Sequence, residues 1–320
     1  MPIDPDVAIG AQLPDRTFSW ESSDVLLYHL GIGAGARPGS QVDRAALRYT
    51  LDDDNLQVLP SFGVVAPTFH ETDPPPLDLP GCKIDLAQVV HGSQSIQVHE
   101  PIPTFGSATL HTRITDVWDK GKAAVIWQEG QAVAADGEPL WTVRSSIFVL
   151  GEGGWGGDRG SSEGVEIPDR APDCDATYDV TPQQALLYRL CGDRNPLHAD
   201  PDFAAKAGFP APILHGLCSW GIVLRTLADE LLGGDAAAVR GFTARFAGVV
   251  FPGETIRVRS VAEPNVGMGS WTWIDWLPWT TWARSILHPG RSSGGGSVSW
   301  NVGATTPKLG STCRSSSSRL

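Results

Sequence analysis

The sequence predicts an α+β fold built from two tandem copies of one unit, with strands in each copy and a long buried helix in the second. The segment Leu26–Leu30 (LLYHL) returns 160 positions later as Leu186–Leu190 (LLYRL), each time shortly before a glycine, which suggests an internal repeat. Alternating apolar and polar residues, typical of half-buried strands, follow in each half. The run from about Leu217 to Leu232 is apolar on most sides and therefore predicts a buried helix.

In the first half, residues 1–20 are expected to be irregular. A helix is predicted from Ser22, capped by Ser23 or Asp24, and it ends at Gly31. Strands are predicted at residues 95–99, 109–115, 122–134 and 140–150, the last two joined as a hairpin across Asp136-Gly137. The glycine-rich segment 151–164 is interpreted as an exposed connection between the halves.

In the second half, Thr181 is predicted to cap a helix, with Pro182 in its first turn and Gln184 closing a capping box. Asp200 and Pro201 predict a further helix start, because an acidic cap followed by proline suits the first turn. Two strands, residues 242–246 and 254–260, are predicted after the long buried helix.

The last sixty residues differ in kind from the rest of the chain. Six tryptophans lie between positions 271 and 300, and serine-rich sequence follows to the end. We predict no strands there, so the sheet of the second unit is expected to have an open edge. The hypothesis is a frame-shifted or disordered tail over residues 261–320, and the alternative is a tryptophan-rich binding patch.

Composition narrows the possible partners and compartments. The chain has 320 residues and a net charge of -12, which argues against binding to nucleic acid or to an anionic membrane surface. Its five cysteines are scattered and never spaced C-x-x-C, so we expect reduced thiols, no zinc site and no disulfides. No secretory signal and no apolar run long enough to span a bilayer is present, and a cytoplasmic location is expected.

The segment between Tyr188 and His198 (YRLCGDRNPLH) contains the candidate catalytic groups. Gly192 and Pro196 interrupt the helix, so Asp193 and His198 can converge on one point. A carboxyl group and an imidazole facing a common point can transfer protons, and Asn195 between them could hold a water. The alternative is an ordinary polar connection between two helices, in which Asp193 is a cap and His198 is hydrogen-bonded.

This segment resembles the signature of the hydratase 2 family, the MaoC-like (R)-specific enoyl-CoA hydratases. A second block, Gly208 to Leu217, is similar to that family at the expected distance. Earlier segments resemble the hydratase domain of peroxisomal multifunctional enzyme type 2 and its actinobacterial relatives, and they lie at residues 27–35, 58–65, 118–122, 144–148 and 156–157. The resemblance extends from about residue 10 to residue 260.

The resemblance implies a double hot-dog fold, with an N-terminal non-catalytic repeat (1–165) that helps to bind the acyl chain, a catalytic repeat (166–260) and the atypical tail (261–320). It implies an (R)-specific trans-2-enoyl-CoA hydratase, reversibly a 3R-hydroxyacyl-CoA dehydratase. The expected substrates are medium- or long-chain acyl-CoA thioesters of fatty-acid or sterol side-chain metabolism. After the repeated segment the first half continues Gly31-Ile32-Gly33, without an acid or a histidine, so we expect chemistry in the second half alone.

By the same resemblance, Asp193 and His198 form the acid/base pair, Asn195 positions the water or Asp193, and the main-chain N–H of Gly216 binds the thioester oxygen. Gly216 also stands where the buried helix begins, and the first N–H groups of a helix are unpaired. The expected substrate-binding residues are Tyr188, Gly192, Arg194, His215 and Leu217. No metal and no cofactor is expected besides the CoA thioester itself, and the expected assembly is a homodimer.

Other residues receive more ordinary interpretations. His215 is expected mainly to brace its loop, Tyr188 to pack, and Cys191 to fill space. Five isolated histidines are expected at the surface or in loops, namely His29, His70, His91, His99 and His111. Asp52–Asp54 is interpreted as a solvated run and not as a metal site. Ser93 stands where relatives carry a glutamate, which leaves the role of its loop open.

Two further functions stay open. The first is a non-catalytic acyl-CoA-binding protein or partner subunit, which the unusual tail suggests. The second is a hot-dog thioesterase, which the Asn195–His198 arrangement disfavours. The C-terminal Ser318-Arg319-Leu320 resembles a peroxisomal targeting signal, so a peroxisomal location is the alternative to the cytoplasm.

Overall fold

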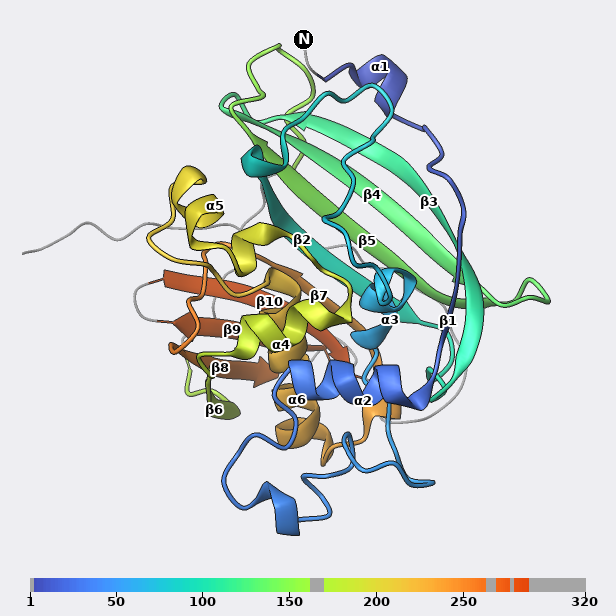
Figure 1. The fold of residues 1–320 in the computed structure, drawn as a ribbon, viewed down its shortest axis with the longest axis vertical. Coiled ribbons are helices and arrows are strands. Elements are labelled where there is room, and N and C mark those ends of the chain that lie inside the picture. The colour runs from blue at the N-terminus through green and yellow to red at the C-terminus, as the bar shows by residue number, and fades with distance from the viewer. Residues whose placement is uncertain (1–2, 162–169, 263–268, 277–278, 288–320) are drawn as a thin grey trace, which may run out of the picture.

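The described strands form one ten-stranded antiparallel sheet (Figure 1). The structure is a computed structural model, and it describes residues 3–161, 170–262, 269–276 and 279–287. The strand order is β1-β3-β4-β5-β2-β7-β10-β9-β8-β6. The first five strands in this order come from the N-terminal half and the last five from the C-terminal half, so the two repeats join where β2 pairs with β7.

Each half contributes one group of strands and its helices. The N-terminal half contains α1 (Pro5–Ala8), β1 (Arg16–Trp20), α2 (Ser22–Gly31), α3 (Phe62–Val65), β2 (Val89–Val98), β3 (Gly106–Asp119), β4 (Ala123–Val133) and β5 (Pro139–Leu150). The C-terminal half contains β6 (Cys174–Asp179), α4 (Gln184–Tyr188), η4 (Arg189–Cys191), η5 (Pro196–His198), α5 (Pro201–Lys206), α6 (Gly216–Leu232), β7 (Val239–Arg245), β8 (Thr255–Ala262), β9 (Gly269–Trp276) and β10 (Trp279–Leu287).

The long helix α6 is the centre of the C-terminal half, as its apolar sequence predicts. Every residue from Cys218 to Ala228 is buried, because the helix has protein on all sides along this stretch. Gly221 lets the first half come close: a Cβ there would lie 2.7 Å from the hydroxyl oxygen of Tyr28 and 2.7 Å from a methyl carbon of Ile32. The two halves therefore share one continuous core.

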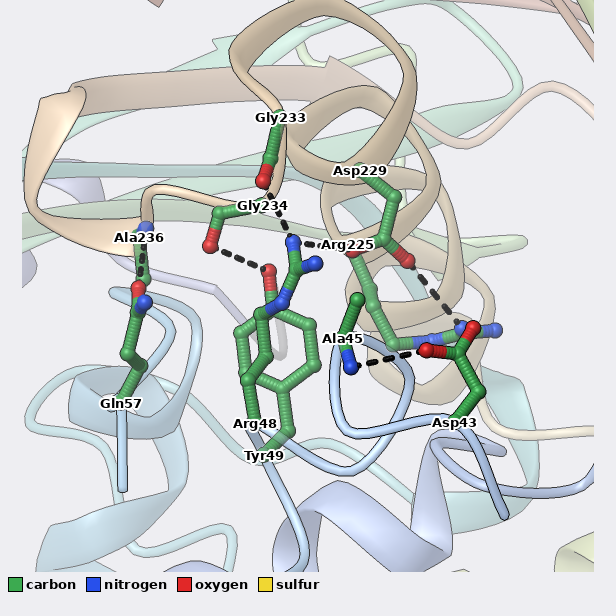
Figure 2. A network of polar contacts seen from close by, with 10 residues as sticks. All are labelled: Asp43, Ala45, Arg48, Tyr49, Gln57, Arg225, Asp229, Gly233, Gly234 and Ala236. Carbon is green, nitrogen blue, oxygen red and sulfur yellow. Dashed lines mark hydrogen bonds and ion pairs between the residues drawn. The ribbon is translucent and has the colours of Figure 1, made fainter. Parts of the chain in front are cut away.

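A loop of the first half closes the C-terminal end of α6 (Figure 2). The guanidinium of Arg48 donates a 2.6 Å hydrogen bond to the carbonyl oxygen of Gly233, and the hydroxyl of Tyr49 donates one of 3.1 Å to that of Gly234. The last carbonyl groups of a helix have no partner within the helix itself. The N-terminal half thus satisfies groups that α6 leaves open.

Helix starts differ in detail from the predictions. Helix α2 is capped by Glu21 and not by Ser23 or Asp24. Asp24 lies inside the first turn, where its carboxylate accepts the main-chain N–H of Glu21 at 2.9 Å in a capping box. Helix α4 begins at Gln184, and the side chain of that residue donates to the carbonyl of Gly31 instead of closing a capping box. The predicted cap at Asp200 and proline at the start of α5 are confirmed. Residues 1–20 are not wholly irregular, since α1 and β1 lie there.

The prediction that no strands follow Ser260 is wrong. Strand β9 pairs with β8, and β10 pairs with both β9 and β7, so these two strands complete the sheet and the expected open edge is covered. Alternation of tryptophan with threonine suits a strand, because bulky aromatic and β-branched residues fit a pleated surface. The sheet of the second unit therefore continues beyond residue 260. Residues 263–268, 277–278 and 288–320 lie outside the described residues, and with them the hypothesis of a disordered end.

The connection after β5 is anchored over its described part. The buried carboxylate of Asp119 accepts main-chain N–H groups of Gly121, Gly154 and Gly156, each at 2.7 Å. These bonds, that of Gly154 foremost, lower the pKa of Asp119 to about 2. A segment that composition alone suggests to be a free linker is thus held against β3.

Candidate active site

The turn that carries the candidate catalytic groups depends on Gly192. Its φ of +100° is in the left-handed region, and a Cβ there would lie 1.9 Å from the carbonyl oxygen of Thr68. After it, the Asp193 carboxylate accepts the main-chain N–H of Asn195 at 3.1 Å. The side-chain oxygen of Asn195 accepts a 3.0 Å hydrogen bond from the main-chain N–H of Leu197 and thereby caps η5. Side-chain caps therefore fold the turn back on itself.

This turn brings Asp193 and His198 together, as the turn residues Gly192 and Pro196 allow, and adds His215. One nitrogen or carboxylate oxygen of each residue lies within 4.8 Å of those of the other two. Both histidines are buried, whereas Asp193 is half-buried. Asp193 can be a turn cap and a member of the acid/base pair at the same time, since its carboxylate accepts a main-chain N–H of the turn and also lies beside the imidazoles.

The protonation of His198 follows from its surroundings. Its Nδ1 lies 2.8 Å from the carbonyl oxygen of Ile213, which has no proton to give, so Nδ1 is the donor. Nε2 of the neutral ring is then a free lone pair, able to accept a proton. Burial lowers the pKa of His198, and the negative charge of Asp193 opposes that effect.

His215 lies directly against His198. The two ring centroids are 3.7 Å apart and the planes differ by 27°. Nε2 of His215 lies 3.3 Å from the main-chain carbonyl oxygen of Asp193. Burial holds the pKa of His215 well below 6.5, and the charge of His198 lowers it further.

Gly216 is the first residue of α6, immediately beyond this stack. Its main-chain N–H precedes the intrahelical hydrogen bonds and has no partner among the described residues. A Cβ at Gly216 would lie 3.5 Å from the ring of Phe246, which is ordinary contact. Local packing thus does not require a glycine at this position.

The other residues predicted to bind substrate have different surroundings. Tyr188 is fully buried and its ring centroid is 4.9 Å from that of His215, which agrees with the packing role expected of it. Half-buried Arg194 donates from Nε to the carbonyl of Glu71 at 3.3 Å. Leu217 is half-buried and packs against the core. Cys191 is buried, and burial raises the pKa of its thiol to about 12, as suits a residue that fills space.

Sequence reasoning missed His91, which it assigned to the surface or to a loop. His91 lies in β2, where the pairing with β5 shifts register between His91 and Ser93. Its ring centroid is 4.9 Å from that of Phe246, and its imidazole interacts electrostatically with Asp193. Burial lowers the pKa of His91 to about 4. The signal in the sequence was the glycine directly after it, because glycine inside a strand often marks a bulge.

The prediction for His29 is also wrong, since this ring is completely buried. Its Nδ1 lies 2.8 Å from the carbonyl oxygen of Tyr49, and its Nε2 accepts the main-chain N–H of Leu59 at 3.3 Å. The other three histidines of that group, His70, His99 and His111, are exposed as predicted. The hydroxyl groups of Ser93 and Ser146 are hydrogen-bonded to each other at 2.7 Å.

The three clustered residues do not suit a shared metal ion. On spacing alone Asp193, His198 and His215 could ligate one. A metal binds an imidazole nitrogen at about 2.1 Å, in the plane of the ring where the lone pair lies. An ion at that distance from both stacked rings would lie far outside both planes. The stack therefore prevents the two histidines from ligating the same ion.

Comparison with known proteins identifies both halves. The family described as MFE-2 hydratase 2 N-terminal domain matches residues 18–151, and the MaoC like domain matches residues 164–270. The chain is 57% identical to enoyl-CoA hydratase ChsH3 of Mycobacterium tuberculosis over 258 residues, covering 81% of this chain and 89% of that protein. It is 37% identical to the peroxisomal enoyl-CoA hydratase 2 of Arabidopsis thaliana, covering 78% and 84%.

Solved structures agree. A MaoC-like dehydratase from Phytophthora capsici superposes with a TM-score of 0.76 at 28% identity, covering 89% of this chain and 98% of that one. A Mycobacterium tuberculosis protein described as a double hotdog fold superposes with a TM-score of 0.51 at 11% identity, covering 89% and 98%, and confirms the fold alone. The chain therefore belongs to the hydratase 2 family of MaoC-like dehydratases, with the double hot-dog fold that its sequence predicts.

Proposed function

We propose that the protein is an (R)-specific trans-2-enoyl-CoA hydratase that also catalyses the reverse dehydration. The observation that carries the proposal is the convergence of three groups: the Asp193 carboxylate, the free Nε2 of His198, and the unpaired N–H of Gly216. Hydration of an enoyl thioester needs a base for water, an acid for the α carbon and a donor for the carbonyl oxygen. Relatives named enoyl-CoA hydratase and 3-hydroxyacyl-thioester dehydratase support the same reaction.

In the proposed reaction one water lies between Asp193 and His198. As its oxygen bonds to C3 of the substrate, the water gives one proton to the Asp193–His198 pair, which passes that proton to C2, so both residues end the reaction as they began. Both atoms come from one side of the double bond, so addition is from a single face and yields the 3R alcohol. The Asn195 oxygen caps η5, which leaves its NH2 group as the part that can orient the water or Asp193.

The carbonyl oxygen of the thioester gains negative charge as water adds. At Gly216 it would meet an N–H at the N-terminus of a 17-residue helix. Such an end carries partial positive charge and open donors, so it stabilises an anion more than a neutral carbonyl. The gain is therefore larger in the transition state than in the ground state, which is the condition for catalysis.

The finer features of the proposal come from the family. We propose medium- or long-chain acyl groups from fatty-acid or sterol side-chain metabolism, with the N-terminal repeat binding the chain, no cofactor, a homodimer and a cytoplasmic location. The peroxisomal alternative rests on Ser318-Arg319-Leu320, which lies outside the described residues. Among the described residues, no helix is both long enough and apolar enough to cross a membrane.

The first test is hydration of trans-2-decenoyl-CoA by the purified protein, followed as loss of the enoyl thioester with chiral analysis of the product. Asp193→Asn should abolish turnover, because the amide can neither take part in this proton transfer nor stabilise a protonated His198. Asp52→Asn makes the same chemical change at an exposed carboxylate and is the matched control. Binding of CoA esters without turnover would favour the acyl-CoA-binding alternative, and release of free CoA thiol would favour a thioesterase.

A further inference from the structure

His215 contacts both members of the proposed acid/base pair and neighbours the proposed oxyanion donor. Its ring stacks on His198 at a centroid distance of 3.7 Å, and its Nε2 lies 3.3 Å from the main-chain oxygen of Asp193. Gly216 is the next residue in the chain. A side chain in this place can hold three catalytic parts in register without touching the substrate.

The hydrogen bonds assign the protons of both rings. The Asp193 main-chain oxygen can only accept, so Nε2 of His215 donates to it, and Nδ1 then carries a lone pair. That Nδ1 is buried and has no partner in the part of the chain that the structure describes. In His198 the arrangement is reversed, since Nδ1 donates to Ile213 and Nε2 is free. Each ring is thus fixed in one tautomer.

The charged groups around the stack favour one proton at most on the two rings. Asp193 faces His198 and favours its protonated form, whereas the groups that act on His215 include Arg189, which disfavours a charge there. Tyr188, whose ring centroid lies 4.9 Å from that of His215, adds a neutral buried hydroxyl. A proton that arrives during turnover therefore belongs on His198, and His215 stays a neutral, flat support.

We propose that His215 is a positioning residue that fixes the ring plane of His198 and the main chain of Asp193, and that it exchanges no proton with the substrate. The proposal rests on the proposed hydratase function. Of the two roles expected from sequence, it replaces substrate binding and makes the bracing role specific to His198 and Asp193. Under this proposal, turnover depends on the stacking of His215 against His198 and not on a change in the protonation of His215.

Three variants separate the contributions of the ring. His215→Phe keeps a flat buried face and loses the hydrogen bond to Asp193. His215→Gln keeps an N–H and loses the stack, and His215→Leu loses both. His111→Phe makes the same change at an exposed histidine and is the control. For each variant kcat, KM, the pH profile of kcat/KM and the melting temperature are measured with trans-2-decenoyl-CoA.

We expect His215→Phe to keep kcat within about fivefold of the wild type. We expect His215→Leu to lower it by about 100-fold with KM within about threefold, because misplacement of about 1 Å costs that much rate. In His215→Leu the acid limb of the profile should move to higher pH, since water entering the vacated space relieves the burial of His198.

Loss of kcat in the phenylalanine variant as complete as in Asp193→Asn would overturn the proposal and make His215 a proton donor or acceptor. A rise in KM alone would restore the substrate-binding role, and a lower melting temperature with unchanged kcat would leave only a structural role.

A second measurement keeps this inference separate from the proposed function. Long-range proton–nitrogen NMR of the histidine rings reports their tautomers and titration without any substrate. We expect Nδ1–H in His198 and Nε2–H in His215 at neutral pH, and a higher pKa of His198 in His215→Leu than in His215→Phe. If the wild type fails to hydrate the enoyl-CoA while these NMR results hold, the hydratase proposal fails and the positioning of His198 stands. Equal His198 titration in all variants would refute the positioning role itself.

Discussion

Substitution of Gly192 by alanine tests whether the turn geometry governs turnover. Gly192 has a φ of +100°, and a Cβ there would lie 1.9 Å from the carbonyl oxygen of Thr68. Left-handed backbone costs an ordinary residue about 1–2 kcal/mol. A carbon and an oxygen that are not bonded need about 3 Å, so the turn must also move by about 1 Å. A displacement of that size at Asp193, the next residue, should lower kcat by about 100-fold.

Gly253 offers a matched control. Its φ is +96°, almost the same, but nothing lies within 4 Å of the position that a Cβ would take. Gly253→Ala should therefore cost about 1–2 kcal/mol of unfolding free energy and leave kcat close to that of the wild type. Both variants are measured by urea unfolding and by hydration of trans-2-decenoyl-CoA. The reasoning is refuted if Gly192→Ala keeps kcat within about threefold of the wild type, or if Gly253→Ala loses as much.

Three other predictions concern titratable side chains inside the fold. The Asp229 carboxylate lies 3.6 Å from the guanidinium of Arg225, a residue that is only 5% exposed (Figure 2). Asp229→Asn leaves that charge buried without its partner and should lower the free energy of unfolding in urea by about 3 kcal/mol. The double variant Arg225→Met with Asp229→Asn should lose clearly less than the sum of the two single variants. The pKa of Asp119 is lowered to about 2, so its carboxylate stabilises the fold above about pH 4, and this stabilisation is lost as the pH falls towards 2. In Asp119→Asn the free energy of unfolding should therefore vary less with pH over that range. An unchanged pH dependence would contradict the role of the glycine N–H bonds to Asp119. The pKa of His91 is lowered to about 4, so its imidazole is neutral near neutral pH. His91→Gln should therefore leave both limbs of the pH profile of kcat/KM in place. A shift of either limb would show that His91 titrates during turnover.

The sequence determined the elements whose evidence is local. The apolar run of α6 predicts a buried helix, and the observed helix begins within one residue of the predicted start. The alternating strands β2 to β5 lie at the predicted positions, with ends that differ by several residues in β2 and β3. Gly192 and Pro196 show that Asp193 and His198 can converge, because turn residues constrain the backbone next to them, and the family resemblance favoured that arrangement.

Contacts between distant segments were decided by the tertiary structure alone. The composition of the tryptophan-rich segment is compatible with strands, but its pairing with β7 and β8 depends on edges that distant parts of the chain supply. His91 reaches the site through a bulge and through the junction of β2 with β7, and His215 stacks on a ring seventeen positions earlier in the chain. Periodicity and turn chemistry report what a residue does to its neighbours in sequence. Burial, ring stacking and the resulting proton positions depend on neighbours in space, and only the folded chain supplies those.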